Sequence, residues 1–326
     1  MNPWMDLFGI SLGSGKSGML IKDLPDEHIE EACALFLQVF SVEVSPVMWR
    51  WKYQGTAQLG AINLVAYDAD GALVGHAGAI VLPGVDQGQS RAMVQICDVM
   101  VAAHHRGGKG DKAVYPALMR AMRAAITARF AGAYAYGFPG KRPFLLGERL
   151  GFYRRAYEIG EQTIAPLSVS TPRWSLTRID VLAQDTLPLH SARLQKLWQY
   201  TAKNTPSPTV VRDAAYVIWR YAQHPARRYA LLMLRGVWRD VAWWIVAHEG
   251  ETLRVVDALG HKARSASALK LLAAWASRQG YVRLLCWRLA MSLPETSTGI
   301  VAMQFALNDI EAIRDPCFMP GDLDIF

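Results

Sequence analysis

The sequence predicts an α/β protein with two domains, and three observations carry that prediction. The chain has 326 residues, of which 52% are hydrophobic, so it can bury a large core but is long for one compact domain. Short apolar segments bounded by turn residues alternate with segments whose apolar residues recur at helical spacing. The order of these segments in the first half returns loosely in the second half, which indicates an internal repeat.

The elements of the first half follow from local signals. Asp23 is a candidate helix N-cap with Pro25 in the first turn, and the pair Asp70-Gly71 is typical of a β-hairpin. Because Pro116 cannot donate a backbone hydrogen bond, we expect the long amphipathic helix to begin late, near Ala113. In chain order the expected elements are a strand at 19–22, a helix over 29–40, a hairpin of 61–67 with 73–82, a strand at 95–101, a helix from about 113 and a strand at 134–138.

The second half repeats specific features of the first. The triplet Trp-Lys-Tyr at 51–53 returns as Trp-Arg-Tyr at 219–221, and an aspartate interrupts an apolar strand in each half, at Asp98 and Asp257. A stretch rich in proline, serine and threonine at 166–174 separates the two halves. We therefore expect a flexible leader over 1–18, a first domain over 19–165 and a second domain over 175–326.

Composition and motifs exclude several classes of protein. No apolar run approaches the roughly 20 residues of a membrane-spanning helix, and the first 18 residues lack the pattern of a secretory signal, so we expect a cytoplasmic protein. Residues 13–17 resemble the end of a P-loop, but Ile10 stands where that motif needs glycine. The four cysteines include no C-x-x-C pair and are expected to be buried and reduced, and no histidine spacing indicates a metal site.

The charge of the chain favours an anionic partner. Its 35 basic and 28 acidic residues give a net charge of +7, which suits a phosphorylated cofactor or a nucleic acid. At 105–110 a strand enters a glycine-rich turn that opens a helix, and such a turn presents free amides and a helix dipole of about half a positive charge to phosphate. Arg106 and Lys109 add positive charge there, so we expect the anion to bind at this turn.

The strand at 97–101, this turn, the helix after it and the Arg-Leu-Gly-Phe at 149–152 occur in an order that resembles the GNAT family of acyl-CoA N-acyltransferases, over about 19–165. The resemblance implies an α+β fold in which each of two GNAT-like domains is a mixed, mostly antiparallel twisted sheet flanked by helices. The second half resembles a degenerate copy, as in tandem GNAT proteins. The resemblance implies acetyl-CoA as cofactor, with its pantetheine on a strand that splays from its neighbour and its pyrophosphate on the loop amides. The residues so assigned are Val99, Met100 and Val101 for the pantetheine, and His105, Arg106, Gly107, Gly108, Lys109 and Gly110 for the pyrophosphate.

The chain also departs from the family pattern. The glycine spacing fits the loop in two registers, one starting at His105 and one starting at Arg106 with an inserted glycine. Gly147 stands where many members carry a tyrosine that protonates the departing thiolate, and the common asparagine after the fifth strand is missing. Three other tyrosines are candidates for that proton donor and are equally consistent with core or rim positions: Tyr136, Tyr153 and Tyr157.

Two carboxylates are candidates for the catalytic base. Asp98 interrupts an apolar strand beside the proposed cofactor, but it also fits a structural cap, because Asp257 repeats it in the half without the glycine loop. Glu148 is the second candidate, with a solvated helix face as its alternative. The acidic and apolar C-terminal stretch 319–326 either brings carboxylates into the cleft between the halves or docks there as a structural tail.

Three functions remain open. The first is acetyl-CoA-dependent N-acetylation of a primary amine on a small molecule, with an amino sugar among the candidates, by direct attack on the thioester. The second is a noncatalytic CoA-binding module, and the third is tRNA-dependent aminoacyl transfer of the tandem GNAT type. Direct nucleic-acid binding through 51–53 is disfavoured, because the return of this triplet at 219–221 indicates core packing.

Overall fold

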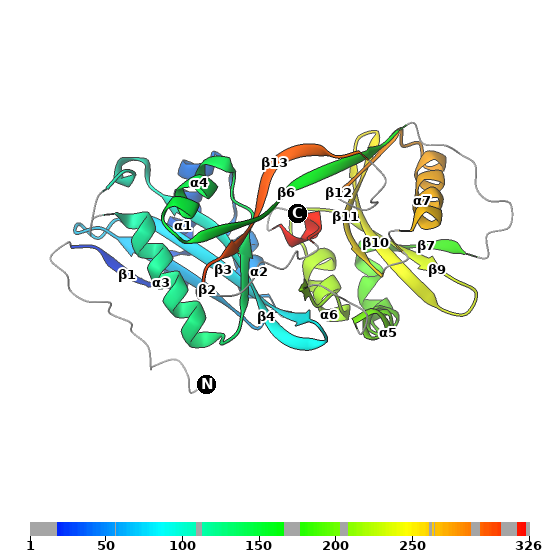
Figure 1. The fold of residues 1–326 in the computed structure, drawn as a ribbon, viewed down its shortest axis with the longest axis horizontal. Helices are drawn as coiled ribbons and strands as arrows, with labels where there is room; N and C mark the ends of the chain where they lie inside the picture. Colours follow the sequence, from blue (N-terminus) through cyan, green and yellow to red (C-terminus); the bar gives the residue numbers. More distant parts are fainter. Residues whose placement is uncertain are drawn as a thin grey trace.

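One continuous sheet runs through the whole molecule, and the two halves of the chain lie side by side along its long axis (Figure 1). The computed structural model describes residues 18–55, 57–108, 113–165, 177–202, 208–260, 263, 265–287, 294–307 and 318–323. The sheet has 13 strands in the order β1-β2-β3-β4-β5-β13-β6-β12-β11-β10-β9-β7, with β8 paired to β3 outside this path. The expected α+β architecture with a mixed, mostly antiparallel sheet is confirmed.

The elements of the first half are, in chain order, β1 (Leu20–Asp23), η1 (Asp26–His28), α1 (Ile29–Phe40), α2 (Pro46–Tyr53), β2 (Gly60–Tyr67), β3 (Leu73–Asp86), β4 (Gln89–Val101), η2 (Ala103–His105), α3 (Val114–Arg129), β5 (Tyr134–Gly137), α4 (Lys141–Arg149) and β6 (Tyr153–Ile164). Those of the second half are β7 (Arg178–Ala183), η4 (Gln184–His190), α5 (Ser191–Ala202), β8 (Thr209–Val210), α6 (Ala214–Val217), η5 (Ile218–Ala222), β9 (Ala230–Arg235), β10 (Asp240–Glu249), β11 (Thr252–Leu259), α7 (Ala266–Arg278), β12 (Arg283–Trp287), β13 (Thr296–Phe305) and η7 (Pro320–Asp322).

The pairing pattern of the sheet reads the same from either edge. Three antiparallel pairings lead from β1 to β4 and likewise from β7 to β11, and each series ends in a parallel pair, β4 with β5 and β11 with β12. In the centre, β13 lies between β5 and β6, while β6 lies between β13 and β12. Each half therefore places one strand, β6 or β13, between two strands of the other half.

The helices cover the sheet through apolar faces that the sequence shows in advance. The helix α3 packs on β2, β3 and β4, and its buried stripe includes Val114, Leu118, Met122 and Ile126 at helical spacing. The helix begins at Val114, so the late start expected from Pro116 is confirmed. A second apolar cluster lies under α7, where Leu272 and Leu284 are fully buried.

Some sequence-based boundaries differ from the structure. The prediction that Asp23 caps the first helix is wrong: Asp23 ends β1 and its carboxylate accepts a hydrogen bond from Arg129 at 3.1 Å, while Pro25 holds the N-cap position. The strand expected from Gln95 begins earlier, at Gln89, because its pairing with β3 extends through the hairpin. The expected leader and the boundary stretch 166–174 lie outside the described residues, apart from Gly18.

Other expectations concern membrane spans and cysteines. Across the described ranges no helix is both long and apolar enough to cross a bilayer. Cys33, Cys97 and Cys286 are buried and free, as expected, while Cys317 lies outside the described residues.

Candidate functional site

The pairing between the strands β4 and β5 ends partway along β4. Their last paired residues are Ile96 and Gly137, after which β4 continues to Val101 and stays paired only with β3. A gap therefore opens between Val101 on one side and Phe138, which follows β5, on the other. Of the three residues assigned to the pantetheine, Met100 is buried in the core, while Val99 and Val101 are partly exposed along the gap.

A β-bulge marks the point where the gap opens. His76 pairs with Met100 and Gly78 with Cys97, so β4 has one residue more than β3 between these pairs. Asp98 lies in the bulge with a left-handed backbone conformation, φ 49°. Few residues other than glycine adopt that conformation, and aspartate is among those that do.

The carboxylate of Asp98 is buried and held by partners from α2. Lys52 Nζ lies 2.6 Å from Asp98 Oδ2, and the Tyr53 hydroxyl donates to the same oxygen at 2.6 Å. The His76 ring nitrogen Nδ1 lies 2.7 Å from the Asp98 carbonyl, and burial lowers the pKa of His76 to about 4, so the ring is neutral at pH 7. Burial and the nearby carboxylate raise the pKa of Tyr53 well above its usual value. This arrangement favours a role for Asp98 in fixing the bulge.

Some backbone amides of the glycine-rich turn are already hydrogen-bonded within the protein, and others are exposed. The amides of His105 and Arg106 donate to Ala102 and Ala103 at 2.9 and 3.2 Å, so they belong to the short helical turn η2. Gly107 and Gly108 are exposed, and within the described ranges the backbone N–H of neither makes a backbone hydrogen bond. The remaining predicted loop residues, Lys109 and Gly110, lie outside the described residues.

The start of α3 adds donors to this turn. No side chain caps Ala113, so the N–H groups of Val114 and Tyr115 point out of the helix without a helical partner. Gly107 adopts φ 82°, which lets the chain turn sharply before the helix. The Arg106 side chain folds back, with Nε donating to the Val101 carbonyl at 2.9 Å. The Arg106 side chain thus links the turn to the end of β4 at Val101.

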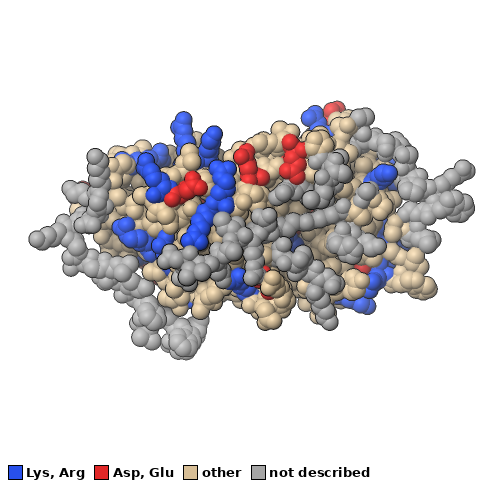
Figure 2. All heavy atoms as spheres, viewed as in Figure 1, with Lys and Arg blue, Asp and Glu red and all other residues tan. Residues whose placement is uncertain are grey.

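Basic side chains gather on the surface beside this gap, over α4 and the start of β6 (Figure 2). The exposed members of this group are Lys141, Arg142, Arg149 and Arg155. Glu148, the second predicted base, is also exposed on α4. A surface with this excess of positive charge attracts an anionic cofactor.

Gly147 is tightly packed where the family resemblance expects a tyrosine. A Cβ at Gly147 would lie 2.1 Å from Cδ2 of Tyr153, so the Tyr153 ring fills the space beside it. Tyr153 is itself buried, and its hydroxyl donates to the sulfur of Met119 at 3.8 Å. Burial and the neighbouring Tyr115 raise the pKa of Tyr153 well above its usual value.

Tyr136 is fully buried on β5, beneath the C-terminal segment. Its ring stacks on Phe318 with 4.7 Å between centroids, and its hydroxyl has no hydrogen-bond partner among the described residues. Burial raises the pKa of Tyr136 well above its usual value. Tyr157 lies on the other side of Phe318, and its hydroxyl oxygen accepts a hydrogen bond from the Phe318 amide at 3.2 Å.

The C-terminal segment 318–323 lies between the two halves, as η7 in Figure 1 shows. Asp322 is paired with the buried Arg212 at 2.6 Å, and Arg212 is also paired with Asp257 at 2.8 Å. Arg220 donates to the carbonyls of Gly321 and Leu323. The segment therefore contacts both halves, and its one described carboxylate is bound to Arg212, while Asp324 lies outside the described residues.

The repeated triplets meet at the boundary between the halves. The rings of Trp51 and Trp219 stack at 5.5 Å, and each indole N–H donates to the carbonyl of the other tryptophan at 2.9 Å. Tyr221 donates to Asp257 at 2.7 Å, as Tyr53 does to Asp98. Sequence reasoning did not identify Lys52 and Arg212 as partners of the two aspartates, although a carboxylate in an apolar strand calls for a nearby cation.

Comparison with known protein families gives a match in the first half of the chain. Residues 20–155 match the family described as "Acetyltransferase (GNAT) domain". No curated protein matches the sequence.

Three solved structures resemble the fold. A conserved protein of unknown function from Enterococcus faecalis V583, described as a probable N-acyltransferase, has a TM-score of 0.67 at 15% identity, covering 88% of this chain and 71% of its own. A GCN5-related N-acetyltransferase from Anabaena variabilis has a TM-score of 0.65 at 17% identity, covering 89% and 73%. A glucosamine N-acetyltransferase region of a fungal multi-domain β-N-acetylglucosaminidase has a TM-score of 0.52 at 14% identity, covering 89% and 38%.

Proposed function

We propose that this chain, whose residues 20–155 match the GNAT acetyltransferase domain family, transfers the acetyl group of acetyl-CoA to a primary amine on a small molecule. The observation that carries the proposal is the opening of β4 from β5 directly beside exposed glycine amides and an uncapped helix start. Backbone N–H groups at a helix N-terminus are suited to bind a pyrophosphate. A free strand edge on β4 is suited to pair with the amides of a pantetheine.

The donors of this chain fit acyl-CoA with one adjustment. Gly107, Gly108, Val114 and Tyr115 are the described residues whose N–H groups would hold the pyrophosphate, because those of His105 and Arg106 are used within η2. Bound acetyl-CoA supplies a thioester whose acyl carbon gains a bond to the amine nitrogen and loses its bond to sulfur, while one proton leaves the amine and one reaches the sulfur.

The residues predicted to move those protons have different surroundings. We assign Asp98 to positioning, because Lys52 and Tyr53 hold its carboxylate and its bulge shapes the edge of the gap. Glu148 is exposed on α4, so it is the one of the two predicted bases that faces solvent. Tyr136 is covered by Phe318, so it would reach a substrate only if that segment moved.

We further propose that the second half is a degenerate GNAT-like copy. The pairing pattern that reads the same from both edges supports this, as do the matching partners of Asp98 and Asp257. The second half has no dense glycine loop after β11, so acetyl-CoA would bind to the first half alone. The fungal protein named as a glucosamine N-acetyltransferase region makes an amino sugar a reasonable first acceptor to assay.

The test of this function is stabilisation by acetyl-CoA followed by an assay of transfer. We expect acetyl-CoA to raise the melting temperature of the protein, and Gly108→Asp to abolish that rise because a carboxylate would face the pyrophosphate. Gly108→Asn is the matched control, since it adds nearly the same volume without charge. Release of free thiol with a panel of amines then detects transfer.

The possible results separate the alternatives. Equal stabilisation of wild type and Gly108→Asp would remove the turn from the cofactor site. Stabilisation without thiol release for any amine would favour the noncatalytic CoA-binding module.

A further inference from the structure

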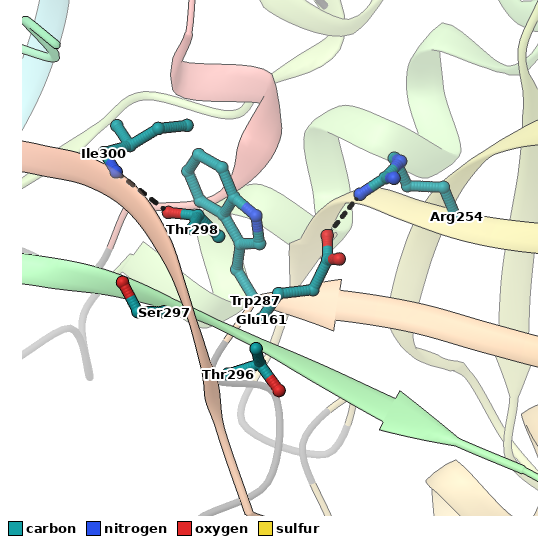
Figure 3. Close-up of a pocket in the computed structure, with 7 residues that line it drawn as sticks. All are labelled: Glu161, Arg254, Trp287, Thr296, Ser297, Thr298 and Ile300. Atoms are coloured by element: carbon teal, nitrogen blue, oxygen red, sulfur yellow. Dashed lines mark hydrogen bonds and ion pairs between the residues drawn. The ribbon is translucent and has the colours of Figure 1, made fainter.

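A cavity lies in the middle of the sheet, outside the gap between β4 and β5. Its volume is about 320 Å³, and elements of both halves contribute to it (Figure 3). This volume is at the lower end of the range for small-molecule sites, so it fits a ligand of one ring better than an oligomer. The lining residues are Glu161, Arg254, Trp287, Thr296, Ser297, Thr298 and Ile300.

The strand β13 is deformed where it lines this cavity. Ser297 pairs with Gly160 and Val301 with Glu158, so three residues of β13 face the single residue between these partners on β6. Gly299 lies in this bulge with φ 71°. Bulges next to binding sites often redirect side chains, and this one begins directly after Ser297, which still pairs with Gly160.

The same bulge connects the cavity with the gap of the first half. Thr298 Oγ1 donates to the Ile159 carbonyl at 2.8 Å and accepts from the Ile300 amide at 3.2 Å, so the bulge is internally bonded. Ile300 forms an isolated bridge with Gly140, the N-cap of α4. Gly140 follows the end of β5 by three residues, so Ile300 adjoins the segment that borders the gap.

The polar groups of the cavity suit a ligand with hydroxyl and ammonium groups. Glu161 Oε1 lies 2.5 Å from Arg254 NH1, and these side chains are 27% and 15% exposed, so both can still meet a ligand. A paired carboxylate and guanidinium offer acceptors and donors side by side, as neighbouring hydroxyl groups require. Thr296 and Ser297 add exposed hydroxyls, and Trp287 forms an apolar floor.

The local charge favours a cation. Arg254 bonds Glu161 and also Glu249, the latter at 2.7 Å, so two carboxylates share one guanidinium. Glu158 lies on β6, and Glu295 directly precedes β13. This acidic group stands out in a chain with a net charge of +7, and it would attract an ammonium ion.

Building on the acyl transfer proposed above, we propose that this cavity holds the acceptor, a small primary amine that carries hydroxyl groups on a single ring. Glu161 and Arg254 bind the ring hydroxyl groups of the acceptor, and the negative charge of Glu161 attracts the cationic acceptor into the cavity. Its reactive nitrogen is directed past Ile300 toward the gap between β4 and β5.

The test measures binding of glucosamine to the full chain by calorimetry, without any acyl-CoA. We expect binding that Glu161→Gln weakens at least tenfold, because the variant removes the negative charge at nearly constant shape. Glu30→Gln, an exposed position on α1, is the matched control and should bind as wild type does. Cyclohexylamine, which has the ring and amine without hydroxyls, should bind much more weakly than glucosamine.

The same samples are tested for stabilisation by acetyl-CoA, which keeps the two proposals apart. Glucosamine that fails to bind, or binds equally to wild type and Glu161→Gln, overturns the cavity assignment while acetyl-CoA stabilisation still supports acyl transfer. Binding that depends on Glu161 without stabilisation by acetyl-CoA would retain the cavity as a ligand site and overturn the transfer. Thr296→Val, which leaves the ion pair in place, serves if Glu161→Gln does not fold and should weaken binding several-fold.

Discussion

A double-mutant cycle on Lys52 and Asp98 separates positioning from catalysis. The two charges lie 2.6 Å apart with 7% and 5% of their side chains exposed, so removing one charge takes away the buried ion pair that the other one makes at this distance. Breaking a buried ion pair in this way costs about 3–5 kcal/mol. We therefore expect Lys52→Met and Asp98→Asn each to lower the free energy of unfolding by about that amount.

The double variant should recover much of this loss. With both charges gone no unpaired ion remains, and asparagine tolerates the left-handed conformation that position 98 requires. A coupling energy of about 2–3 kcal/mol is expected, since contacting residues of a buried network are strongly non-additive. Urea denaturation followed by tryptophan fluorescence measures it, because Trp49 and Trp51 lie on the same helix as Lys52.

The functional readout of the same cycle is decisive. If Asp98 only positions the bulge, the double variant regains both stabilisation by acetyl-CoA and turnover. A double variant that is stable and binds acetyl-CoA but has no turnover would refute this reasoning and return Asp98 to the role of base. Single losses that simply add up would refute the ion pair as the origin of the effect.

Two further predictions concern pH and the C-terminal segment. Burial holds the pKa of His76 at about 4, below the 6.5 of an unfolded chain, so neutral His76 contributes about 3 kcal/mol to the free energy of unfolding in full above pH 6.5, and this contribution is lost as the pH falls toward 4. The variant His76→Gln should therefore flatten the dependence of the unfolding free energy on pH in that window. An unchanged slope would contradict this prediction. Deleting residues 318–326 uncovers Tyr136 and leaves Arg212 with Asp257 as its remaining carboxylate; we expect stronger binding of an apolar dye and a lower melting temperature, whereas no change in either would show that the segment does not hold the halves together.

The sequence predicts the first half of the fold well because its signals are local. The Asp70-Gly71 turn, the stripe on α3 and the missing donor at Pro116 each act within a few residues, and each appears in the structure as expected. The error at Asp23 has the opposite origin. A distant residue, Arg129, binds that carboxylate, and pairing of Asp23 with Leu64 extends the strand through the expected cap.

The site was predictable in outline and less so in its bonding. Glycines and the strand before them indicate an anion-binding turn. The sequence does not show, however, that the backbone amides of His105 and Arg106 already donate hydrogen bonds within η2. Asp98 stands out in its apolar strand, but its partner Lys52 lies 46 residues earlier on a helix, and no local sequence pattern indicates that this lysine is buried. The interleaving of β6 and β13 depends on pairing between strands about 140 residues apart, so it lies beyond any local signal.

The position of the C-terminal segment explains why the two similar halves would differ in chemistry. In the second half β11 parts from β12 after Arg254 and Leu285, just as β4 parts from β5 in the first. Gly321 is seated against this stretch of β11, where a Cβ would lie 3.2 Å from that of Asp257 and 3.3 Å from the Val256 carbonyl. The chain itself therefore occupies the second half at a position corresponding to the bulge of the first. On the proposed function an anionic cofactor would find a strand edge and exposed amides together in the first half, and the same segment covers Tyr136 there through the stacking of Phe318.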